Sequence, residues 1–524
     1  MACTTILVGK KASWDGSTIV ARNEDSGGNE FTPKKFVVVQ PKDQPHHYVS
    51  HVSHVHVELP QNPMRYTALP DALGKDGIWA AAGVNSANVA MTATETITAN
   101  ERLLAADPLV EYRPASGNPG EASYTPEVQG GIGEEDFVTL VLPYITSARE
   151  GVKRLGALLE KYGTYEMNGI AFSDINEIWW LETIGGHHWI AKRVPDDSYV
   201  TMPNQLGIDA FEMHDAFGEQ EEHMCSADLW DFMEKNNLDL TLGSDGNVFN
   251  PRDAFGTHSE RDHVYNTCRS WYMQRYLNPS QSWDGRLAAH GPESDNIPWD
   301  QEPERKLTIE DINFVLSSHF DGTAYDPYDE IGTEEQRRRF RPIGINRESQ
   351  SHIIQLRGNA PAPCRAVEWI SYGSNAFTTF TPYFANINRT PEYLSNTTDE
   401  PTTESYYWAS RIIAALADSH FKDNINTIDG YVEKTLSAGH RTIIDIDNKI
   451  AKLQKENNLV ISDDETPDDM STENAEIDAH VIELLEATNE KTACNLKQAT
   501  YKLLYKVLYT SSLLMRNAFK LSDH

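Results

Sequence analysis

The order in which hydrophobic patterns follow one another constrains the fold of this chain more than any single motif. Apolar runs of strand length occupy much of the sequence before residue 404, and one helical stripe, from Val138 to about Tyr162, interrupts them. Helical patterns then fill two long segments, 404–457 and 476–520, on either side of an acidic, proline-containing connector at 462–474. Strands, a helix, further strands and terminal helices in this order predict an α+β fold with layered sheets.

The strands can be assigned from short apolar runs that end in turn residues. Beyond a first hairpin near the N-terminus, we expect them at Phe36–Val39, Val49–Val57, Ile78–Val84, Val89–Thr94, Gly169–Ser173, Glu177–Glu182, Trp189–Arg193, Tyr199–Gln205, Ala366–Tyr372 and Ala376–Pro382. A polar stretch from Asp107 to Glu135 predicts a long surface loop, and loops of this length often serve as lids or binding elements.

Composition and charge exclude several classes of function. The net charge of −33 argues against nucleic acid and anionic membranes as partners. No stretch approaches the ~20 consecutive apolar residues of a membrane span. The first residues lack the pattern of a secretory signal, so we expect a cytoplasmic protein. Five cysteines, at positions 3, 225, 268, 364 and 494, predict neither a disulfide framework nor a structural zinc site.

Cys3 stands in an apolar run that leads into the first hairpin. The turn Trp14-Asp15-Gly16-Ser17 connects this run to a second strand, Thr18–Ala21, which is followed by Arg22 and Asp25. We expect the hairpin to return these two charged residues to the neighbourhood of Cys3, where a cation favours a thiolate and a carboxylate can orient an amine. Once residues 1 and 2 are removed, the α-amino group of Cys3 can accept the proton of its own thiol, so no separate histidine is required.

Two other groups of residues are weaker candidates. Cys268 precedes an expected helix start, and a helix N-terminus lowers the pKa of a thiol, but a structural role is favoured and Arg269 is the more informative neighbour. His51, His54 and His56 have metal-ligand spacing, and in a strand His54 and His56 would share one face. An exposed polar strand is favoured over a metal site because no cysteine or close carboxylate pair completes a ligand set. We therefore expect neither a metal nor a cofactor.

Further motifs give the chain a family resemblance. Most of it comes from Cys3–Gly9 and Ala21–Asp25, and it is extended by Gly131–Glu135, Pro203–Leu206, Asp321–Thr323 and Asn346–Gln350. With these motifs the chain resembles the C69 dipeptidases of the N-terminal-nucleophile (Ntn) hydrolase superfamily, which includes penicillin V acylases and bile salt hydrolases. The resemblance implies a four-layer αββα sandwich in residues 1–403 and a mainly helical C-terminal region, 404–524, that packs on it.

The resemblance also implies roles for individual residues. Cys3 would be the nucleophile, Arg22 would stabilise its thiolate and Asp25 would hold the terminal amine. Asn204 would contribute a side-chain N–H to the oxyanion site, and Arg269 would be the distal active-site arginine. The expected reaction is attack of the thiolate on an amide carbonyl, protonation of the leaving amine and hydrolysis of the thioester by water.

One departure from the acylase branch bears on the substrate. Where that branch has an asparagine completing the oxyanion site, this sequence has Glu95, whose carboxylate would repel an oxyanion but suit a substrate ammonium. The sequence therefore favours a dipeptidase acting on dipeptides with free N-termini. Two alternatives stay open: an N-acyl amide hydrolase on the same fold, and a secernin-like protein without turnover. The expected partners are dipeptide substrates and, in a homo-oligomer, further copies of the chain.

Overall fold

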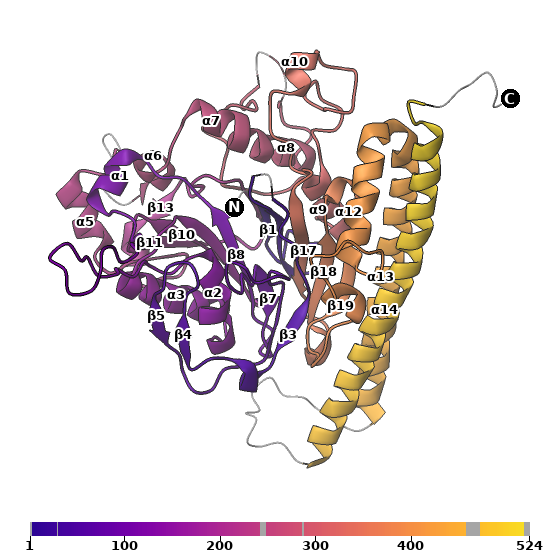
Figure 1. Ribbon diagram of the computed structural model, residues 1–524, viewed down its shortest axis with the longest axis horizontal. Coiled ribbons are helices and arrows are strands. Elements are labelled where there is room, and N and C mark those ends of the chain that lie inside the picture. The colour runs from indigo at the N-terminus through magenta and orange to yellow at the C-terminus, as the bar shows by residue number, and fades with distance from the viewer. Residues whose placement is uncertain are drawn as a thin grey trace. The chain divides into compact units, whose positions relative to one another are not determined.

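The computed structural model describes residues 3–28, 30–240, 248–283, 285, 288–456 and 472–517. Met1 and Ala2, whose removal is expected, and residues 462–471 of the expected connector lie outside this range. The chain divides into two compact units: unit 1 contains residues 1–22 and 39–308, and unit 2 contains residues 23–38 and 309–524. Figure 1 shows the elements of both. A single strand, β2 (Thr18–Asp25), supplies residues to each unit.

Two sheets form the centre of unit 1. The first contains, in addition to β2, the strands β1 (Cys3–Val8), β12 (Tyr199–Met202) and β16 (Asp300–Gln301). Their order is β16-β12-β1-β2, and β1 pairs antiparallel with β12. The second contains β7 (Ala82–Val84), β8 (Ala90–Thr96), β9 (Asn168–Ser173), β10 (Ile178–Ile184), β11 (His188–Arg193) and β14 (His223–Cys225). It is antiparallel, in the order β14-β11-β10-β9-β8-β7.

Side chains from the two sheets meet at β1 and β8. The hydroxyl of Thr5 donates to Glu95 Oε2 at 2.7 Å, and Arg22 Nε donates to Thr92 Oγ1 at 3.0 Å. Helix α3 (Ala148–Tyr162) packs on β9, β10 and β11, whereas α8 (Cys268–Leu277) packs on β12. Thr5 on β1 and Arg22 on β2 are therefore enclosed within unit 1.

Shorter elements complete unit 1. Its remaining helices are α1 (Glu101–Ala106), α2 (Glu134–Val141), α4 (Met213–Ala216), α5 (Leu229–Asn236), α6 (Pro251–Phe255) and α7 (Glu260–Asp262). Its remaining strands are β4 (His47–Val49), β5 (His56–Glu58), β6 (Tyr66–Ala68), β13 (Phe211–Glu212) and β15 (Val248–Phe249), with β3 (Val37–Val39) at the boundary of the units.

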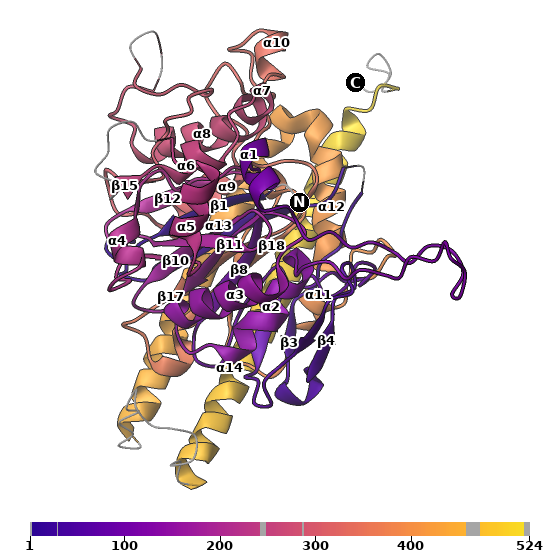
Figure 2. The ribbon, with the colours of Figure 1, turned by 90° about the vertical axis from the view of Figure 1, so that its left-hand side faces the viewer.

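Unit 2 combines an antiparallel sheet with long helices. The end of β2 is followed in the sheet by β17 (Glu348–Leu356), β18 (Ala366–Tyr372) and β19 (Thr381–Phe384). Its helices are α9 (Ile309–Ser317), α10 (Glu334–Arg337), α11 (Glu392–Ser395), α12 (Tyr406–Ala417), α13 (Phe421–Glu456) and α14 (Thr472–Leu513). Figures 1 and 2 show α13 and α14 side by side, and both contact β19. In the described parts of the chain, each helix is too short or too polar to cross a membrane.

The mixed α+β class and the long terminal helices are confirmed, as are most of the strands in the sheets. The expected helix over 138–162 is wrong in one respect, because α2 ends at Val141 and α3 begins only at Ala148. Pro143 lacks an N–H and lies in the break. The side chain of Asn85 donates to the carbonyls of Leu142 and Ile145, at 2.9 and 2.7 Å, and so satisfies backbone groups that the break releases.

The expected strand over 49–57 is also wrong. The structure has a short hairpin, β4 and β5, with a turn between the strands in which His54 adopts a left-handed φ of 58°. His51 and His54 therefore lie in the turn, while His56 contacts His47 Nε2 at 2.9 Å. The apolar run 78–84 likewise contains only the short strand β7, because Trp79 has a φ of 47°, which is incompatible with an extended chain.

Candidate active site

The thiol of Cys3 is fully buried beside a buried arginine. Cys3 is the first residue of β1, and Arg22 lies on the adjacent strand β2, so the hairpin brings them together as the sequence predicts. Arg22 Nη1 donates to Cys3 Sγ at 3.1 Å. The rest of the guanidinium is held by Thr92 and by the carbonyls of Ala81 and Ala93, at 2.9 and 2.8 Å. These contacts fix the direction in which the cation meets the sulfur.

The backbone of Cys3 is held by two further residues expected at the site. Its nitrogen donates to Asn204 Oδ1 at 3.2 Å. Arg269 donates from Nη1 to the carbonyl oxygen of Cys3 and from Nη2 to Asn204 Oδ1, the latter at 2.8 Å. The Nδ2 group of Asn204 donates to the carbonyl of Thr96 at 2.9 Å. The thiol, nitrogen and carbonyl of one residue are thus each contacted by a separate polar side chain.

Carboxylates also surround the thiol. Burial raises the pKa of Cys3 well above its usual value, Arg22 opposes this effect, and the charges of Glu95 and Glu134 add to it. Glu134 Oε1 lies 4.0 Å from Arg22 Nη1, and Glu95 accepts from Thr5. With Cys3 in an ordinary peptide linkage, this environment disfavours the thiolate. A positive charge next to Cys3, such as a terminal ammonium, would favour it.

The first turn of α2 brings further acidic residues to the site. Glu134, Glu135 and Asp136 are buried at this helix N-terminus, where carboxylates interact favourably with the helix dipole. Glu166 accepts from the backbone N–H of Glu134 at 3.0 Å. Burial and the charge of Glu134 raise the pKa of Glu166 to about 7. The surface loop expected up to residue 135 therefore ends earlier than the sequence indicates, because these acids belong to a buried helix.

Asp25 lies at the end of β2, in the part of the strand that belongs to unit 2. It is buried and pairs with Arg341, and its Oδ2 lies 3.6 Å from Arg347 Nε. Its role in holding an amine stays a prediction.

The segment around Cys268 differs from the expected helix start. Helix α7 continues through a π-helical turn, His263–Thr267, directly into α8, so Cys268 lies inside a continuous helical segment. Its thiol donates to the carbonyl of Val264 at 3.4 Å. Because Cys268 lies beyond the first turn of this segment, the argument from a helix N-terminus does not apply to it, and the structural role that the sequence favours stays the prediction.

Sequence reasoning missed two residues near Cys3. Thr92 orients Arg22, and Asn266 contacts both Asn204 and Arg269. Asn266 precedes Arg269 by three residues, which places both on one helix face. This spacing of three residues is the sequence pattern from which Asn266 could have been predicted. Thr92 had no comparable signal, because a contact between two sheets cannot be read from local patterns.

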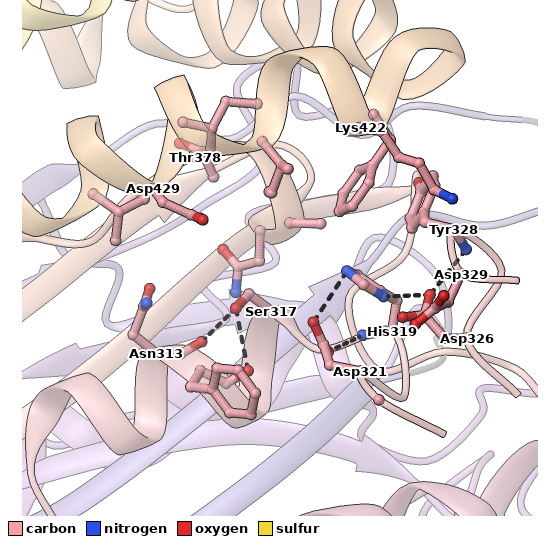
Figure 3. Close-up of a pocket in the computed structure, with 18 residues that line it drawn as sticks. Asn313, Ser317, His319, Asp321, Asp326, Tyr328, Asp329, Thr378, Lys422 and Asp429 are labelled. Atoms are coloured by element: carbon pink, nitrogen blue, oxygen red, sulfur yellow. Dashed lines mark hydrogen bonds and ion pairs between the residues drawn. The ribbon is translucent and has the colours of Figure 1, made fainter. Parts of the chain in front are cut away.

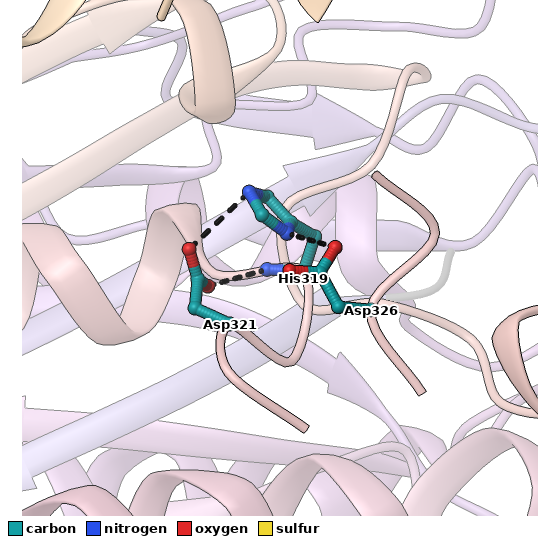
Figure 4. A group of neighbouring side chains, drawn as sticks. All are labelled: His319, Asp321 and Asp326. Carbon is teal, nitrogen blue, oxygen red and sulfur yellow. Dashed lines mark hydrogen bonds and ion pairs between the residues drawn. The ribbon is translucent and has the colours of Figure 1, made fainter. Parts of the chain in front are cut away.

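Unit 2 contains a separate cavity of about 530 Å³. Figure 3 shows His319, Asp321 and Asp326 on one side and Lys422 and Asp429, from α13, on the other. His319 lies between two carboxylates, with Nδ1 2.8 Å from Asp326 Oδ1 and Nε2 3.3 Å from Asp321 Oδ1 (Figure 4).

This histidine and its two aspartates are the one group in the described chain with the proximity that a metal site requires. Burial lowers the pKa of His319, but the hydrogen bond to Asp326 and the charges of both aspartates raise it above its usual value overall. Since both ring nitrogens already meet carboxylates, the arrangement is that of a charged, hydrogen-bonded triad.

Comparison with known proteins identifies the family. Residues 2–434 match the model of peptidase family C69. The chain is 56% identical to a dipeptidase of Bifidobacterium longum and 50% identical to a probable dipeptidase A of Streptococcus pyogenes, in each case over the full length of both proteins. It is 44% identical to dipeptidase A of Lactobacillus helveticus over 86% of this chain and 89% of that protein.

A mixed α+β fold with a buried thiol beside an arginine is compatible with a hydrolase, and the comparisons identify the class of hydrolase. The chain belongs to peptidase family C69. Within this family it is of the dipeptidase type, and it is similar to dipeptidase A along its whole length.

Proposed function

We propose that this chain is an Ntn dipeptidase that hydrolyses dipeptides with free N-termini through a thioester on Cys3. The contact of 3.1 Å between Arg22 Nη1 and Cys3 Sγ carries the proposal, because a guanidinium at this distance favours a thiolate. The similarity to full-length dipeptidases supports the substrate class.

The active form requires removal of residues 1 and 2. In this proposal the thiol of Cys3 attacks the carbonyl carbon of Ala2, the bond from that carbon to the nitrogen of Cys3 breaks, and water hydrolyses the resulting thioester. The nitrogen becomes an amine with an ordinary pKa near ~8, close to that of a thiol. It can therefore take the proton from the sulfur.

Hydrolysis of a dipeptide then repeats the same chemistry on an external substrate. The sulfur forms a bond to the peptide carbonyl carbon, the ammonium of Cys3 protonates the leaving amine, and water cleaves the thioester to release the first amino acid. Glu95 would accept the substrate ammonium. Asn204 would supply an N–H to the oxyanion; a side-chain amide carries two such groups, and one of them meets Thr96.

The four-layer αββα sandwich belongs to the same proposal. It is supported by the packing of α8 on β12, of β1 on β8 and of α3 on β9 to β11 within unit 1. A catalytic domain over residues 1–403 and a helical region over 404–524 remain the proposed division.

The test combines a mass measurement with a substrate panel. The purified chain should have the mass expected for a start at Cys3 and should cleave dipeptides but not their N-acetylated forms. The Cys3→Ala variant should lose activity, while Cys225→Ala, which changes another buried thiol, should keep it. Full hydrolysis by Cys3→Ala would refute the proposal, and a preference for blocked N-termini would identify an acylase instead.

A further inference from the structure

The contacts of Cys3 continue beyond Asn204 and Arg269 to a second layer of buried side chains. Asn266 lies in the π-helical turn between α7 and α8 and is 4% exposed. Its Oδ1 accepts from Arg269 Nη2 at 2.8 Å, and its Nδ2 donates to the carbonyl of Asn204 at 3.1 Å. One amide thus contacts both residues that hold the backbone of Cys3.

The orientation of the Asn266 amide is determined by its neighbours. Nδ2 also donates to Asp262 Oδ1 at 2.8 Å, so two acceptors face the NH₂ group while a guanidinium faces the oxygen. Rotating the amide by 180° would place donor against donor and acceptor against acceptor. Asp262 is itself 3% exposed, and its Oδ2 accepts from the backbone and the hydroxyl of Ser259, at 2.9 and 2.7 Å. The path from Ser259 to Cys3 is therefore a continuous series of directed contacts.

The π-helical turn brings Asn266 and Arg269 to Asn204. A π-turn adds a residue to the helical repeat and occurs frequently at functional sites. Here it presents Asn266 and Arg269 toward the same residue, Asn204. Arg269 is further held by donation from Nε to the carbonyl of Tyr265 at 2.8 Å.

We propose that Asn266, oriented by Asp262, is a positioning residue for the amine of Cys3. It holds Asn204 and Arg269 so that the nitrogen and carbonyl of Cys3 stay in the geometry required for proton transfer. This inference rests on the proposed function. It assigns Asn266 no contact with substrate, so its loss should affect the chemical step and leave substrate affinity unchanged.

The test compares Asn266→Ala with Asn278→Ala. Asn278 is a matched control because it follows the last turn of α8, is 2% exposed and contacts Tyr199 and the carbonyl of Glu302, away from Cys3. We expect kcat of Asn266→Ala to fall by about 10²-fold, the loss typical of small misplacements of reacting groups, with KM unchanged. The acid limb of the pH–rate profile should move, because it reports the titration of the amine–thiol pair. Asn278→Ala should keep the kcat and the pH profile of the unmodified enzyme.

Asp262→Asn provides a second variant that leaves Asn266 itself in place. It keeps the side-chain shape, but it removes the charge and replaces one of the two acceptor oxygens, which face Asn266 Nδ2 and Ser259, with an NH₂ donor. It should give a smaller change in kcat and a pH profile that moves in the same direction as that of Asn266→Ala. Intact mass and thermal unfolding of every variant separate failed removal of residues 1 and 2, or failed folding, from a defect in turnover. If Asn266→Ala cannot be purified, Asp262→Asn decides the question.

Two outcomes overturn the inference while leaving the proposed function intact. In one, the unmodified chain starts at Cys3 and cleaves dipeptides, but Asn266→Ala behaves like Asn278→Ala in kcat and pH profile. In the other, the loss appears in KM alone. By contrast, an unmodified chain that is fully active with residues 1 and 2 in place would refute the proposed function itself.

Discussion

Cys3 is held by groups that have different chemical tasks. Arg22 donates to the sulfur and would stabilise a negative charge on it, whereas Asn204 Oδ1 accepts from the nitrogen and so suits an amine or ammonium. Glu95 and Glu134 oppose Arg22 by raising the pKa of the thiol. While the nitrogen of Cys3 is an uncharged amide, burial and the two glutamates outweigh the effect of Arg22 on the pKa of the thiol, and an ammonium at this nitrogen would lower that pKa.

Replacing Glu95 tests this balance of charge. In Glu95→Gln the loss of a nearby negative charge should lower the pKa of the Cys3 thiol, so alkylation by iodoacetamide at a fixed pH below that pKa should become faster. The KM for dipeptides should rise by about tenfold, which corresponds to ~1.4 kcal/mol of lost attraction for the substrate ammonium. Glu182→Gln, which changes another buried carboxylate in the same unit, is the control. Slower alkylation together with an unchanged KM would contradict the assignment.

At the scale of elements, interruptions of helices and turns between elements determine where several buried polar side chains lie. The interruption between α2 and α3 is stabilised by Asn85, and the π-turn before α8 aligns Asn266 with Arg269. In unit 2, the segment after α9 folds back so that His319 lies between Asp321 and Asp326. Such features satisfy backbone or charged groups that regular helices and strands would leave buried without partners.

The His319 triad predicts a pH-dependent contribution to stability. Because the pKa of His319 is raised in the folded protein, its contribution is fully present below the unfolded value of about 6.5 and is lost as the pH rises through the folded value. Asp326→Asn should therefore lower the free energy of unfolding by about 1.5–3 kcal/mol near pH 6, and by less at pH 9. Urea unfolding at both values checks this.

Glu310→Gln is the matched control for the triad, because it removes the half-exposed carboxylate that pairs with His440. An exposed pair of this kind contributes at most about 1 kcal/mol. A destabilisation by Asp326→Asn that grows from pH 6 to pH 9 would show that the sign assigned to His319 is wrong.

Local patterns predicted a substantial part of this architecture. The hairpin that joins Cys3 to Arg22 could be predicted because its two strands are adjacent in sequence. The resemblance to a family added Asn204 and Arg269, which lie 201 and 266 residues from Cys3. The break at Pro143 was missed because the apolar stripe continues across it. Asn266 was missed because its partners are determined by tertiary packing.

At the scale of the whole molecule, negative charge is the dominant property of the chain. The sequence contains 78 acidic and 45 basic residues, which give the net charge of −33. Charge of this size keeps a protein soluble but also destabilises its compact state through self-repulsion. The possible homo-oligomer would have to overcome the same repulsion and stays a prediction.

Salt should therefore stabilise the folded chain. Raising KCl from 0.01 to 0.15 M shortens the Debye length from about 30 Å to about 8 Å, so we expect the midpoint of thermal unfolding at pH 7.5 to rise by a few degrees. Near the isoelectric point of about 4.9 the increase should be much smaller, because the net charge is small there. A midpoint that falls with added KCl at pH 7.5 would mean that attractive ion pairs outweigh the repulsion.

The three-point attachment of Cys3 has a consequence for how the enzyme becomes active. Chain ends usually fray unless other contacts hold them. Here the sulfur, nitrogen and carbonyl of residue 3 are anchored before any bond is cut. If residues 1 and 2 are removed as we propose, activation requires only the cleavage chemistry and no folding step at Cys3. The new N-terminus produced by this cleavage would already be held in place by the contacts of its sulfur, nitrogen and carbonyl.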